Sequence, residues 1–251
     1  MNALEIRGLT KRRGDFALQG LDLTLPAGCI MGLIGENGAG KSTTIRLILN
    51  ALSRDGGTVA VYGKDNRALT PLEREDIGAV LDEVGLPEYM NAQQIGRMMA
   101  GIFTHWQPEV YAGYLRRLAL PEDKPFRDFS RGMKMKQGLA VALSHQPKLL
   151  LLDEATSGLD PVVRDEILTI FADFTRDEEH AVLLSSHIVS DLEKICDYIA
   201  FLHKGRLLLC EEKDRLTEAY GILRGGAEDI DPAAVCGRHT CLLYTSPSPR
   251  D

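Results

Sequence analysis

Gly35-Glu-Asn-Gly-Ala-Gly-Lys-Ser42 is the stretch of sequence that decides the fold. It matches the P-loop pattern G-x-x-x-x-G-K-[ST], in which glycines let backbone N–H groups curve around a phosphate. Residues 29–34 before it are nearly all apolar, as in a strand buried on both faces, and residues 42–52 after it repeat apolar side chains at helical spacing. Strand, glycine loop and helix in this order predict the phosphate-binding corner of an α/β core.

The motif predicts which residues contact the phosphates and Mg²⁺. The helix that begins after the glycines points the positive end of its dipole at the anion, and Lys41 is expected to reach the β- and γ-phosphates. The hydroxyl of Ser42 is expected to ligate Mg²⁺. The predicted nucleotide-binding residues of this segment are Gly35, Asn37, Gly38, Ala39, Gly40, Lys41, Ser42 and Thr43.

Two acidic residues follow four consecutive leucines at residues 149–152. A buried strand ends where its side chains reach the edge of the sheet, and ligands bind at the carboxyl ends of parallel strands. Asp153 is therefore placed to hold Mg²⁺, directly or through water, and Glu154 to polarise the attacking water. An apolar strand ending in Asp-Glu is weak support by itself, but together with the upstream P-loop it predicts an ATP-hydrolysing site.

The remaining sequence predicts an α/β fold with a mainly parallel sheet. Residues 4–25 alternate apolar and polar side chains, which indicates half-buried antiparallel strands, and residues 86–145 are helical with breaks at prolines. Short strands alternate with helices in the second half, which indicates parallel pairing. We therefore expect a P-loop NTPase core with an N-terminal antiparallel β subdomain and an inserted α-helical subdomain. The other predicted segments are strands at 148–152 and 181–184, a helix at 162–174, and a hairpin of strands 198–203 and 206–210.

Composition resembles that of ordinary soluble proteins and disfavours some classes of function. The net charge of −7 comes with no dense Lys/Arg block, which argues against a nucleic-acid partner. No apolar run approaches the roughly 20 residues that span a bilayer. The charged N-terminal segment does not resemble a signal peptide, so we expect a cytoplasmic protein. The five cysteines are scattered without a CxxC pair, which favours reduced thiols over disulfides or a metal site.

Three further segments resemble motifs of the ABC ATPases. Phe129-Ser-Arg-Gly-Met133 resembles the signature LSGGQ, Ser157-Gly-Leu-Asp160 resembles the D-loop, and Ser185-Ser-His187 ends in a histidine placed like the switch histidine of that family. The motifs occur in the family's order, and the resemblance covers residues 1 to about 224, which we predict to be the ATPase domain. It is a resemblance to the ATPases of bacterial drug- and peptide-export transporters whose membrane subunits are separate proteins.

The resemblance implies a composite site made by two chains, as a homodimer or as a heterodimer with a second ABC ATPase. Each ATP, with Mg²⁺, would lie between the P-loop of one chain and the signature of the other. Glu154 and His187 would act on the attacking water and the γ-phosphate, and Asp160 would cross the seam between the chains. Hydrolysis would drive export through an integral membrane permease, contacted by residues 82–103, at the inner face of the cell membrane. The residues assigned to the signature are Ser130, Arg131, Gly132 and Met133.

Three places depart from the family pattern. Arg13 stands where an aromatic residue usually stacks on adenine, so its planar guanidinium stacks on the base, or Phe16 substitutes, or Arg13 is a solvated surface charge. Asp82 stands where a glutamine is expected; it can still offer oxygen to Mg²⁺ but adds negative charge near the phosphates. Arg131 and Met133 replace a glycine and a glutamine of the signature. Because the serine and glycine with direct phosphate roles are kept, we expect an active ATPase.

A soluble ABC ATPase of DNA repair or translation is the alternative to a transport subunit. Translation-type members carry two cassettes in one chain and repair types carry long coiled-coil insertions, and the sequence shows neither. A kinase-like P-loop enzyme is a third alternative, which the signature and the histidine disfavour. The transported substrate, the direction of transport and the choice between homodimer and heterodimer stay open at this point.

The C-terminal segment is expected to lie outside the ATPase domain. We interpret residues 225–240 as the start of a truncated accessory region. Residues 241–251, Cys-Leu-Leu-Tyr-Thr-Ser-Pro-Ser-Pro-Arg-Asp, match the translation of a transposase mosaic end that runs into a sequencing adapter. We therefore interpret them as an artefact rather than as a disordered polar tail, and exclude them from the predicted fold.

Overall fold

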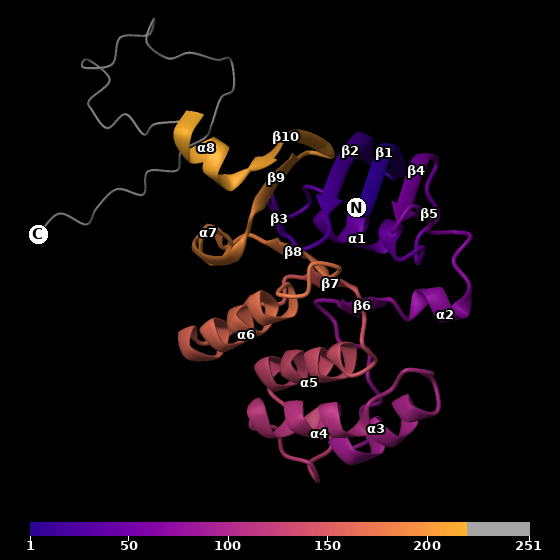
Figure 1. Ribbon diagram of the computed structural model, residues 1–251, viewed down its shortest axis with the longest axis vertical. Coiled ribbons are helices and arrows are strands. Elements are labelled where there is room, and N and C mark those ends of the chain that lie inside the picture. Colours follow the sequence, from indigo (N-terminus) through magenta and orange to yellow (C-terminus); the bar gives the residue numbers. More distant parts are fainter. Residues whose placement is uncertain (220–251) are drawn as a thin grey trace, which may run out of the picture.

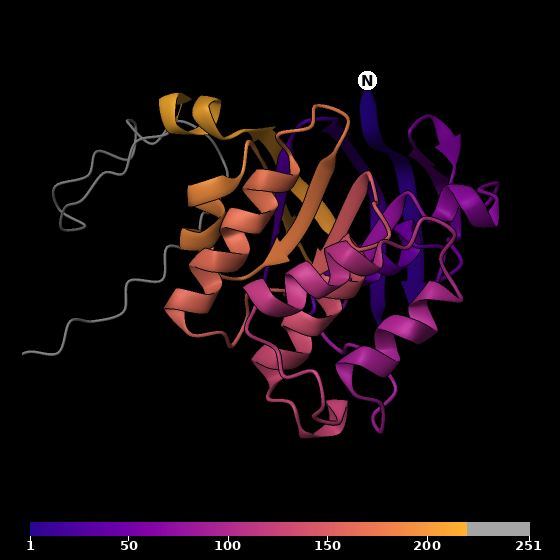
Figure 2. The same ribbon diagram turned by 60° about the horizontal axis from the view of Figure 1, so that its bottom comes forward.

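Helix α1 (Lys41–Ile48) lies between two β-sheets in the computed structural model, which describes residues 1–219 (Figures 1 and 2). Its apolar residues Ile45, Leu47 and Ile48 are buried in a core to which strands of both sheets contribute. The P-loop that precedes α1 is therefore held between the two sheets. The two C-terminal segments interpreted above, 225–240 and 241–251, lie outside the described residues.

The N-terminal antiparallel sheet predicted from the alternating pattern is confirmed. Its first two strands form a hairpin in which Arg13 pairs with Phe16 at the tip. That pairing brings the two candidate base-contacting residues to one end of the sheet. Sequence analysis gave no strands between residues 56 and 65, but two are present and complete the sheet. The described strands follow the spatial order β2 (Phe16–Pro26), β1 (Asn2–Arg13), β4 (Gly56–Val61) and β5 (Lys64–Asp65), all antiparallel.

The second sheet is mainly parallel, as predicted. At one edge lies the antiparallel hairpin predicted at residues 198–210. The other neighbouring strands pair in parallel. One strand, at residues 77–80, was not predicted as such. Within the described residues the spatial order is β10 (Arg206–Glu212), β9 (Tyr198–His203), β3 (Ile30–Ile34), β8 (Ala181–Ser186), β7 (Leu149–Asp153) and β6 (Ile77–Val80).

The four leucines of β7 show why this sheet forms. All four are fully buried, and successive side chains of a strand point to opposite faces. Leu149 and Leu151 join the core that contains α1, whereas Leu150 and Leu152 join the core on the other face. A strand covered on both faces needs a continuous apolar run, which is the pattern seen in the sequence.

The helices occupy two positions relative to this sheet. Apolar residues of α5, α6 and α7 share the core on the face away from α1, and α3, α4 and α5 form the lower part of the molecule in Figure 1. No helix among residues 1–219 combines the length and apolar character that a bilayer crossing needs. Besides α1, the described helices are α2 (Pro71–Arg74), α3 (Ala92–Ala100), α4 (Pro108–Arg117), the 3-10 turn η1 (Phe126–Asp128), α5 (Arg131–Leu143), α6 (Pro161–Phe174), α7 (Val189–Ile195) and α8 (Lys213–Ala219).

The helix predicted at residues 42–52 was too long at its C-terminal end. α1 stops at Ile48, and Asn50 adopts a left-handed conformation with φ of 54°. The backbone N–H groups of Ala51 and Leu52 both bond back to the carbonyl oxygen of Arg46, which closes the helix instead of extending it. Apolar spacing therefore continued beyond the helix because residues of the following turn also face the core.

Candidate nucleotide-binding site

The P-loop curves tightly between β3 and α1, and its glycines are needed for that path. Gly38 and Gly40 have φ values of 82° and 114°, a region that residues with a side chain rarely adopt. Gly35 is required for a different reason, because a Cβ there would lie 2.4 Å from the carbonyl oxygen of Leu202. The loop thus presses its backbone against β9 and turns the opposite side towards the cavity.

Lys41, the first residue of α1, holds the loop from inside. Its Nζ donates hydrogen bonds to the carbonyl oxygens of Gly35 at 2.7 Å and Glu36 at 3.3 Å. The same ammonium lies 3.2 Å from Oε1 of Glu154, and the lysine side chain is only 6% exposed. The buried positive charge is therefore satisfied by two carbonyls and one carboxylate, all of which compete with any phosphate that enters.

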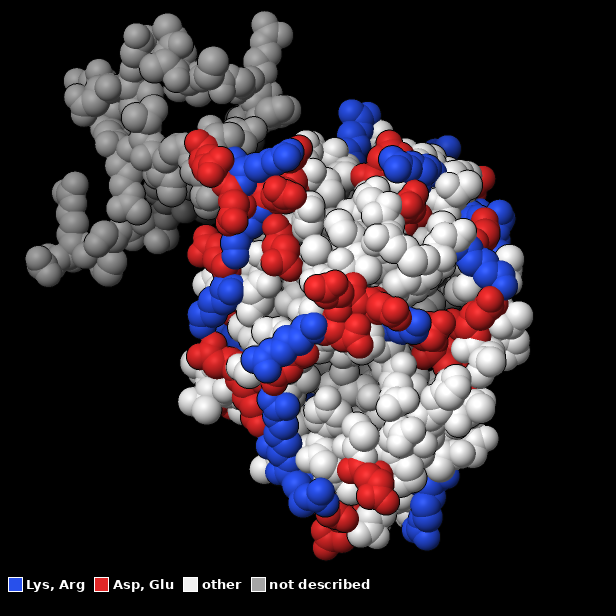
Figure 3. Space-filling view, in the orientation of Figure 1, with Lys and Arg blue, Asp and Glu red and all other residues white. Residues whose placement is uncertain are grey.

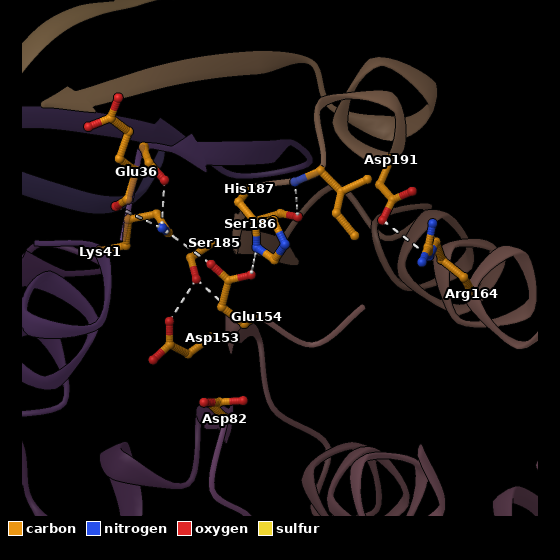
Figure 4. Close-up of polar contacts among 12 residues, drawn as sticks. Glu36, Lys41, Asp82, Asp153, Glu154, Arg164, Ser185, Ser186, His187 and Asp191 are labelled. Carbon is orange, nitrogen blue, oxygen red and sulfur yellow. Dashed lines mark hydrogen bonds and ion pairs between the residues drawn. The ribbon is translucent and has the colours of Figure 1, made fainter. Parts of the chain in front are cut away.

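Asp153 and Glu154 lie where β7 reaches the carboxyl edge of the sheet, as predicted. Asp153 is 2% exposed, and its Oδ1 accepts a hydrogen bond from the Ser185 hydroxyl at 2.7 Å. The same hydroxyl accepts a bond from the backbone N–H of Glu154 at 3.1 Å. Ser185 therefore fixes both acidic residues at once (Figure 4). Sequence reasoning missed this role, because it depends on the parallel register that pairs Asp153 with Ser185.

Glu154 connects the P-loop to the histidine after β8. One carboxylate oxygen faces Lys41, and the other lies 2.7 Å from Nδ1 of His187 (Figure 4). Oε1 is buried without an aligned hydrogen-bond donor, although the ammonium of Lys41 is close. The residue has a φ of 53°, which turns the carboxylate out of the strand direction. Glu154 is thus aimed at the space in front of the P-loop.

A cavity of about 370 Å³ opens in front of the P-loop. It contains most of the residues predicted to bind nucleotide, and it brings Asp82 and the hairpin tip of the antiparallel sheet to the same space. Glu36 also lines it, although its position in the motif accepts any residue and gave no reason to select it. Gly35, Ala39 and Asp153 are buried and are not among the residues that line it. The lining residues are Arg13, Phe16, Glu36, Asn37, Gly38, Gly40, Lys41, Ser42, Thr43, Asp82 and Glu154.

The predicted signature lies away from this cavity. Ser130 is the N-cap of α5, where its hydroxyl accepts a bond from the backbone N–H of Met133 at 3.3 Å. None of residues 129–133 is among the described residues that line the cavity of their own chain. Ser130 and Arg131 are exposed, and Gly132 packs so closely on Leu159 that a Cβ would lie 3.1 Å from that leucine. The signature therefore presents a helix N-terminus to the outside.

The D-loop and the histidine loop are tied to each other by a buried contact. Asp160 caps α6 by accepting a bond from Val163 N–H at 3.0 Å. On the next turn Arg164 lies 3.6 Å from Asp191 of α7, whose side chain is 2% exposed (Figure 4). A charge pair of this kind costs several kcal/mol when one partner is removed, so it keeps α6 and α7 in one relative position.

The site is acidic overall and lacks a complete metal cage. Acidic side chains gather across the middle of the face in Figure 3, between the antiparallel sheet and the lower helices. Among residues 1–219 no group of three or more His, Cys, Asp or Glu side chains could hold a metal ion alone. Mg²⁺ is usually bound by one or two carboxylates together with substrate phosphates. Asp153, whose Oδ2 has no hydrogen bond to the described residues, and Ser42 fit that requirement.

These features define a P-loop nucleoside triphosphatase: a phosphate loop between a parallel strand and a helix, with an Asp-Glu pair at the end of a neighbouring strand. The ABC transporter family profile matches residues 18–157. This chain belongs to the ABC transporter family, and its domain is the ATP-binding and ATP-hydrolysing one.

Individual relatives agree with the family assignment. The chain is 37% identical over 212 residues to the ABC transporter ATP-binding protein YhcH of Bacillus subtilis (strain 168), covering 82% of this chain and 68% of that protein. It is 31% identical over 217 residues to the lantibiotic transport ATP-binding protein SrtF of Streptococcus pyogenes, covering 84% and 91%. A solved ATP-binding subunit of an ABC transporter superimposes with a TM-score of 0.79 at 25% identity, covering 86% of this chain and 92% of the other.

Proposed function

We propose that this chain binds ATP and Mg²⁺ in the P-loop cavity, pairs head to tail with a second ABC ATPase chain, and drives export through a separate membrane permease. The relatives support the transport part of this proposal, because one of them is described as a lantibiotic transport protein. A peptide or drug-like substrate is therefore the class we propose. The chain itself would lie on the cytoplasmic face of the membrane beside its permease.

The observation that carries the proposal is the position of the signature outside its own chain's cavity. A nucleotide on the P-loop would meet Lys41 and the loop amides on one side only. Ser130 caps α5 within its own chain, but the start of that helix is exposed and would favour an anion presented from outside the chain. Two chains arranged head to tail would bring these surfaces together, so that each ATP is enclosed by both.

The residues of the cavity suit the individual tasks of hydrolysis. Lys41 would exchange its carbonyl partners for the β- and γ-phosphates. Ser42 and Asp153, with Asp82 in reach, would hold Mg²⁺, which would supply positive charge to the phosphate oxygens. Glu154 would then accept a proton from the attacking water, and His187, which already contacts Glu154, would contact the γ-phosphate.

The tip of the β1–β2 hairpin is proposed to hold the base. Arg13 and Phe16 line the outer end of the cavity, and Phe16 packs so close to Gly40 that a Cβ there would lie 2.8 Å from its ring. A guanidinium and a phenyl ring both stack on a purine. We propose that the two side chains together replace the single aromatic residue typical of the family.

Residues 82–103 are proposed to contact the permease. This stretch carries two large apolar side chains, Tyr89 and Ile102, that are 77% and 61% exposed. Large apolar side chains left in water are candidates for burial against a partner protein, so we propose that these two meet the permease. The substrate contacts would belong to the permease, and this chain would supply closing and reopening of the pair.

A complementation experiment tests the two-chain site directly. Lys41→Ala and Ser130→Ala chains are each expected to lack ATP turnover. When the two are mixed in equal amounts, half the dimers combine one chain of each kind, and each such dimer contains one intact composite site. Turnover should return to roughly a quarter of the wild-type value. Thr70→Ala removes the hydroxyl cap of α2, which does not line the cavity, and controls for the loss of a helix cap.

Two outcomes would contradict the proposal. Normal turnover of the Ser130→Ala chain alone would show that the signature serine is not part of the site. Inactive single variants without any recovery on mixing would show that both functions belong to one chain. Reconstitution with a candidate membrane permease in vesicles, with the peptide and ATP supplied on the side that carries the ATPase, tests the coupling to export separately.

A further inference from the structure

We propose that Asp82 and Arg131 form a nucleotide-sensitive latch: Asp82 holds Arg131 in the free chain and releases it, when nucleotide fills the cavity, to contact the γ-phosphate bound by a second chain. The inference rests on the head-to-tail pairing proposed above and adds a control on it. Both residues occupy places where the family pattern has an uncharged residue. The two departures are in contact with each other.

The contact joins two elements that belong to different halves of the composite site. Asp82 lies just after β6, and Arg131 is the first residue of α5. Nη2 of Arg131 lies 2.5 Å from Oδ1 of Asp82. The aliphatic part of the arginine passes over the D-loop, since a Cβ at Gly158 would lie 3.8 Å from its Cδ. The arginine is thereby held along the surface of its own chain by Asp82 and the D-loop.

Asp82 is the residue through which the nucleotide cavity can affect Arg131. It lines the 370 Å³ cavity of the P-loop, and it also lines a second cavity of about 490 Å³ to which Arg131 and Lys134 belong. Its carboxylate is thus accessible from both sides. A nucleotide that arrives with Mg²⁺ brings a divalent cation close to this carboxylate, and that cation would compete with the guanidinium for its oxygens.

The start of α5 has an electrostatic imbalance that favours such a release. Its first turn contains no acidic residue, while Arg131 and Lys134 lie at or near the positive end of the helix dipole. Cations at a helix N-terminus are unfavourable, and anions there are favourable. In the free chain the carboxylate of Asp82 compensates the arginine. A phosphate presented by a second chain would satisfy the arginine, the dipole and the free N–H groups together.

The pair is weak enough to be opened by ligand binding. The side chains of Asp82 and Arg131 are 52% and 56% exposed. Ion pairs with this exposure shift an equilibrium by roughly two- to fivefold, and salt screens them further. Opening the latch therefore changes the affinity between chains measurably without preventing the pairing. A buried pair such as Arg164–Asp191 would not respond in this way.

The test measures the ATP concentration at half-maximal dimerisation by light scattering, in the Glu154→Gln background to suppress hydrolysis. Asp82→Asn removes the charge but keeps an oxygen for the Mg²⁺ shell. It should lower the midpoint roughly two- to fivefold, because Arg131 is already free. Arg131→Gln should raise the midpoint. In the Arg131→Gln chain the further change Asp82→Asn should have no effect. Asp165→Asn removes a carboxylate from an ion pair of similar length and exposure, with Lys194, and serves as the matched control.

Each outcome decides for or against the latch. If Asp82→Asn raises the midpoint with or without Arg131, Asp82 acts only as a Mg²⁺ ligand, and the latch is wrong. If Arg131→Gln leaves the midpoint unchanged, the arginine contacts no phosphate, and the latch is again wrong. If Lys41→Ala and Ser130→Ala chains fail to complement each other, the pairing itself is wrong, so the two failures are distinguishable.

Discussion

Replacing Ser185 with alanine is expected to weaken both the fold and the use of Mg²⁺. The side chain is fully buried between the ends of β7 and β8. Its hydroxyl donates to Oδ1 of Asp153 at 2.7 Å and accepts from the backbone N–H of Glu154 at 3.1 Å. Alanine removes both bonds. The backbone N–H of Glu154 would still donate to the backbone carbonyl oxygen of residue 185, at 3.1 Å. The main loss is therefore the hydrogen bond to the buried carboxylate of Asp153.

The lost hydrogen bond to Asp153 sets the size of the expected loss of stability. A hydrogen bond to a charged group contributes about 1.5–3 kcal/mol, and an unsatisfied buried carboxylate oxygen loses that amount. We therefore expect the free energy of unfolding to fall by about 2 kcal/mol. For a domain of 150–250 residues this corresponds to a Tm lower by about 4–8 °C. Asp153 would also become free to rotate, so the Mg²⁺ concentration needed for half-maximal ATP turnover should rise.

The assay combines urea unfolding, followed by circular dichroism, with Mg²⁺ titration of ATP turnover. Ser144→Ala is the matched control, because Ser144 is equally buried but donates to the neutral carbonyl oxygen of Ala140 within α5. It should lose about 1 kcal/mol of stability and keep the wild-type Mg²⁺ midpoint. If Ser185→Ala matches Ser144→Ala in both measurements, the hydroxyl does not position Asp153, and the argument is refuted.

Two further substitutions test the packing of the P-loop and of the residues that follow α5. Gly35→Ala should abolish nucleotide binding in calorimetric titration, since its Cβ would meet a β9 carbonyl oxygen at 2.4 Å; Gly113→Ala on α4 meets no atom within 4 Å and should bind normally. Burial lowers the pKa of His145, which stacks on Phe103 at 4.2 Å. His145 therefore binds a proton more readily in the unfolded chain than in the folded one. As the pH falls below 6.5, protonation of His145 in the unfolded chain lowers the free energy of unfolding. Unfolding in urea at pH 7.5 and 5.5 should show a smaller difference for His145→Gln than for wild type; an equal difference would contradict the assignment.

The parts of the site that could be predicted are those encoded by neighbours in the sequence. The P-loop is a continuous eight-residue motif, and its context of strand and helix is also local. The Asp-Glu pair follows a strand whose four leucines had to be covered on both faces, which located it at the edge of the sheet. Most of these predicted residues line one cavity because the carboxyl ends of parallel strands meet at one edge.

The parts that could not be predicted depend on contacts between distant segments. Ser185 faces Asp153 only because β7 and β8 pair in one particular register, and a shift by one residue would turn the serine to the other face. The predicted end of α1 was wrong because Leu49 and Leu52 of the following turn also pack against the core. Strand β6 is only four residues long, so its pattern is too short to distinguish from a loop.

Asp82 and Arg131 show how two unfavourable changes can be explained together. Taken separately, an aspartate in place of an amide adds a negative charge beside the phosphates, and an arginine adds a positive charge at the positive end of a helix. Each change alone would shift the electrostatics of an already acidic site. In contact at 2.5 Å the two charges cancel, so the free chain keeps the net charge that an uncharged pair would give. Such a pair differs from two neutral residues because the charges reappear when a ligand separates them. Substituting both residues with neutral ones should therefore preserve the fold and leave the ATP midpoint for dimerisation where Arg131→Gln alone puts it.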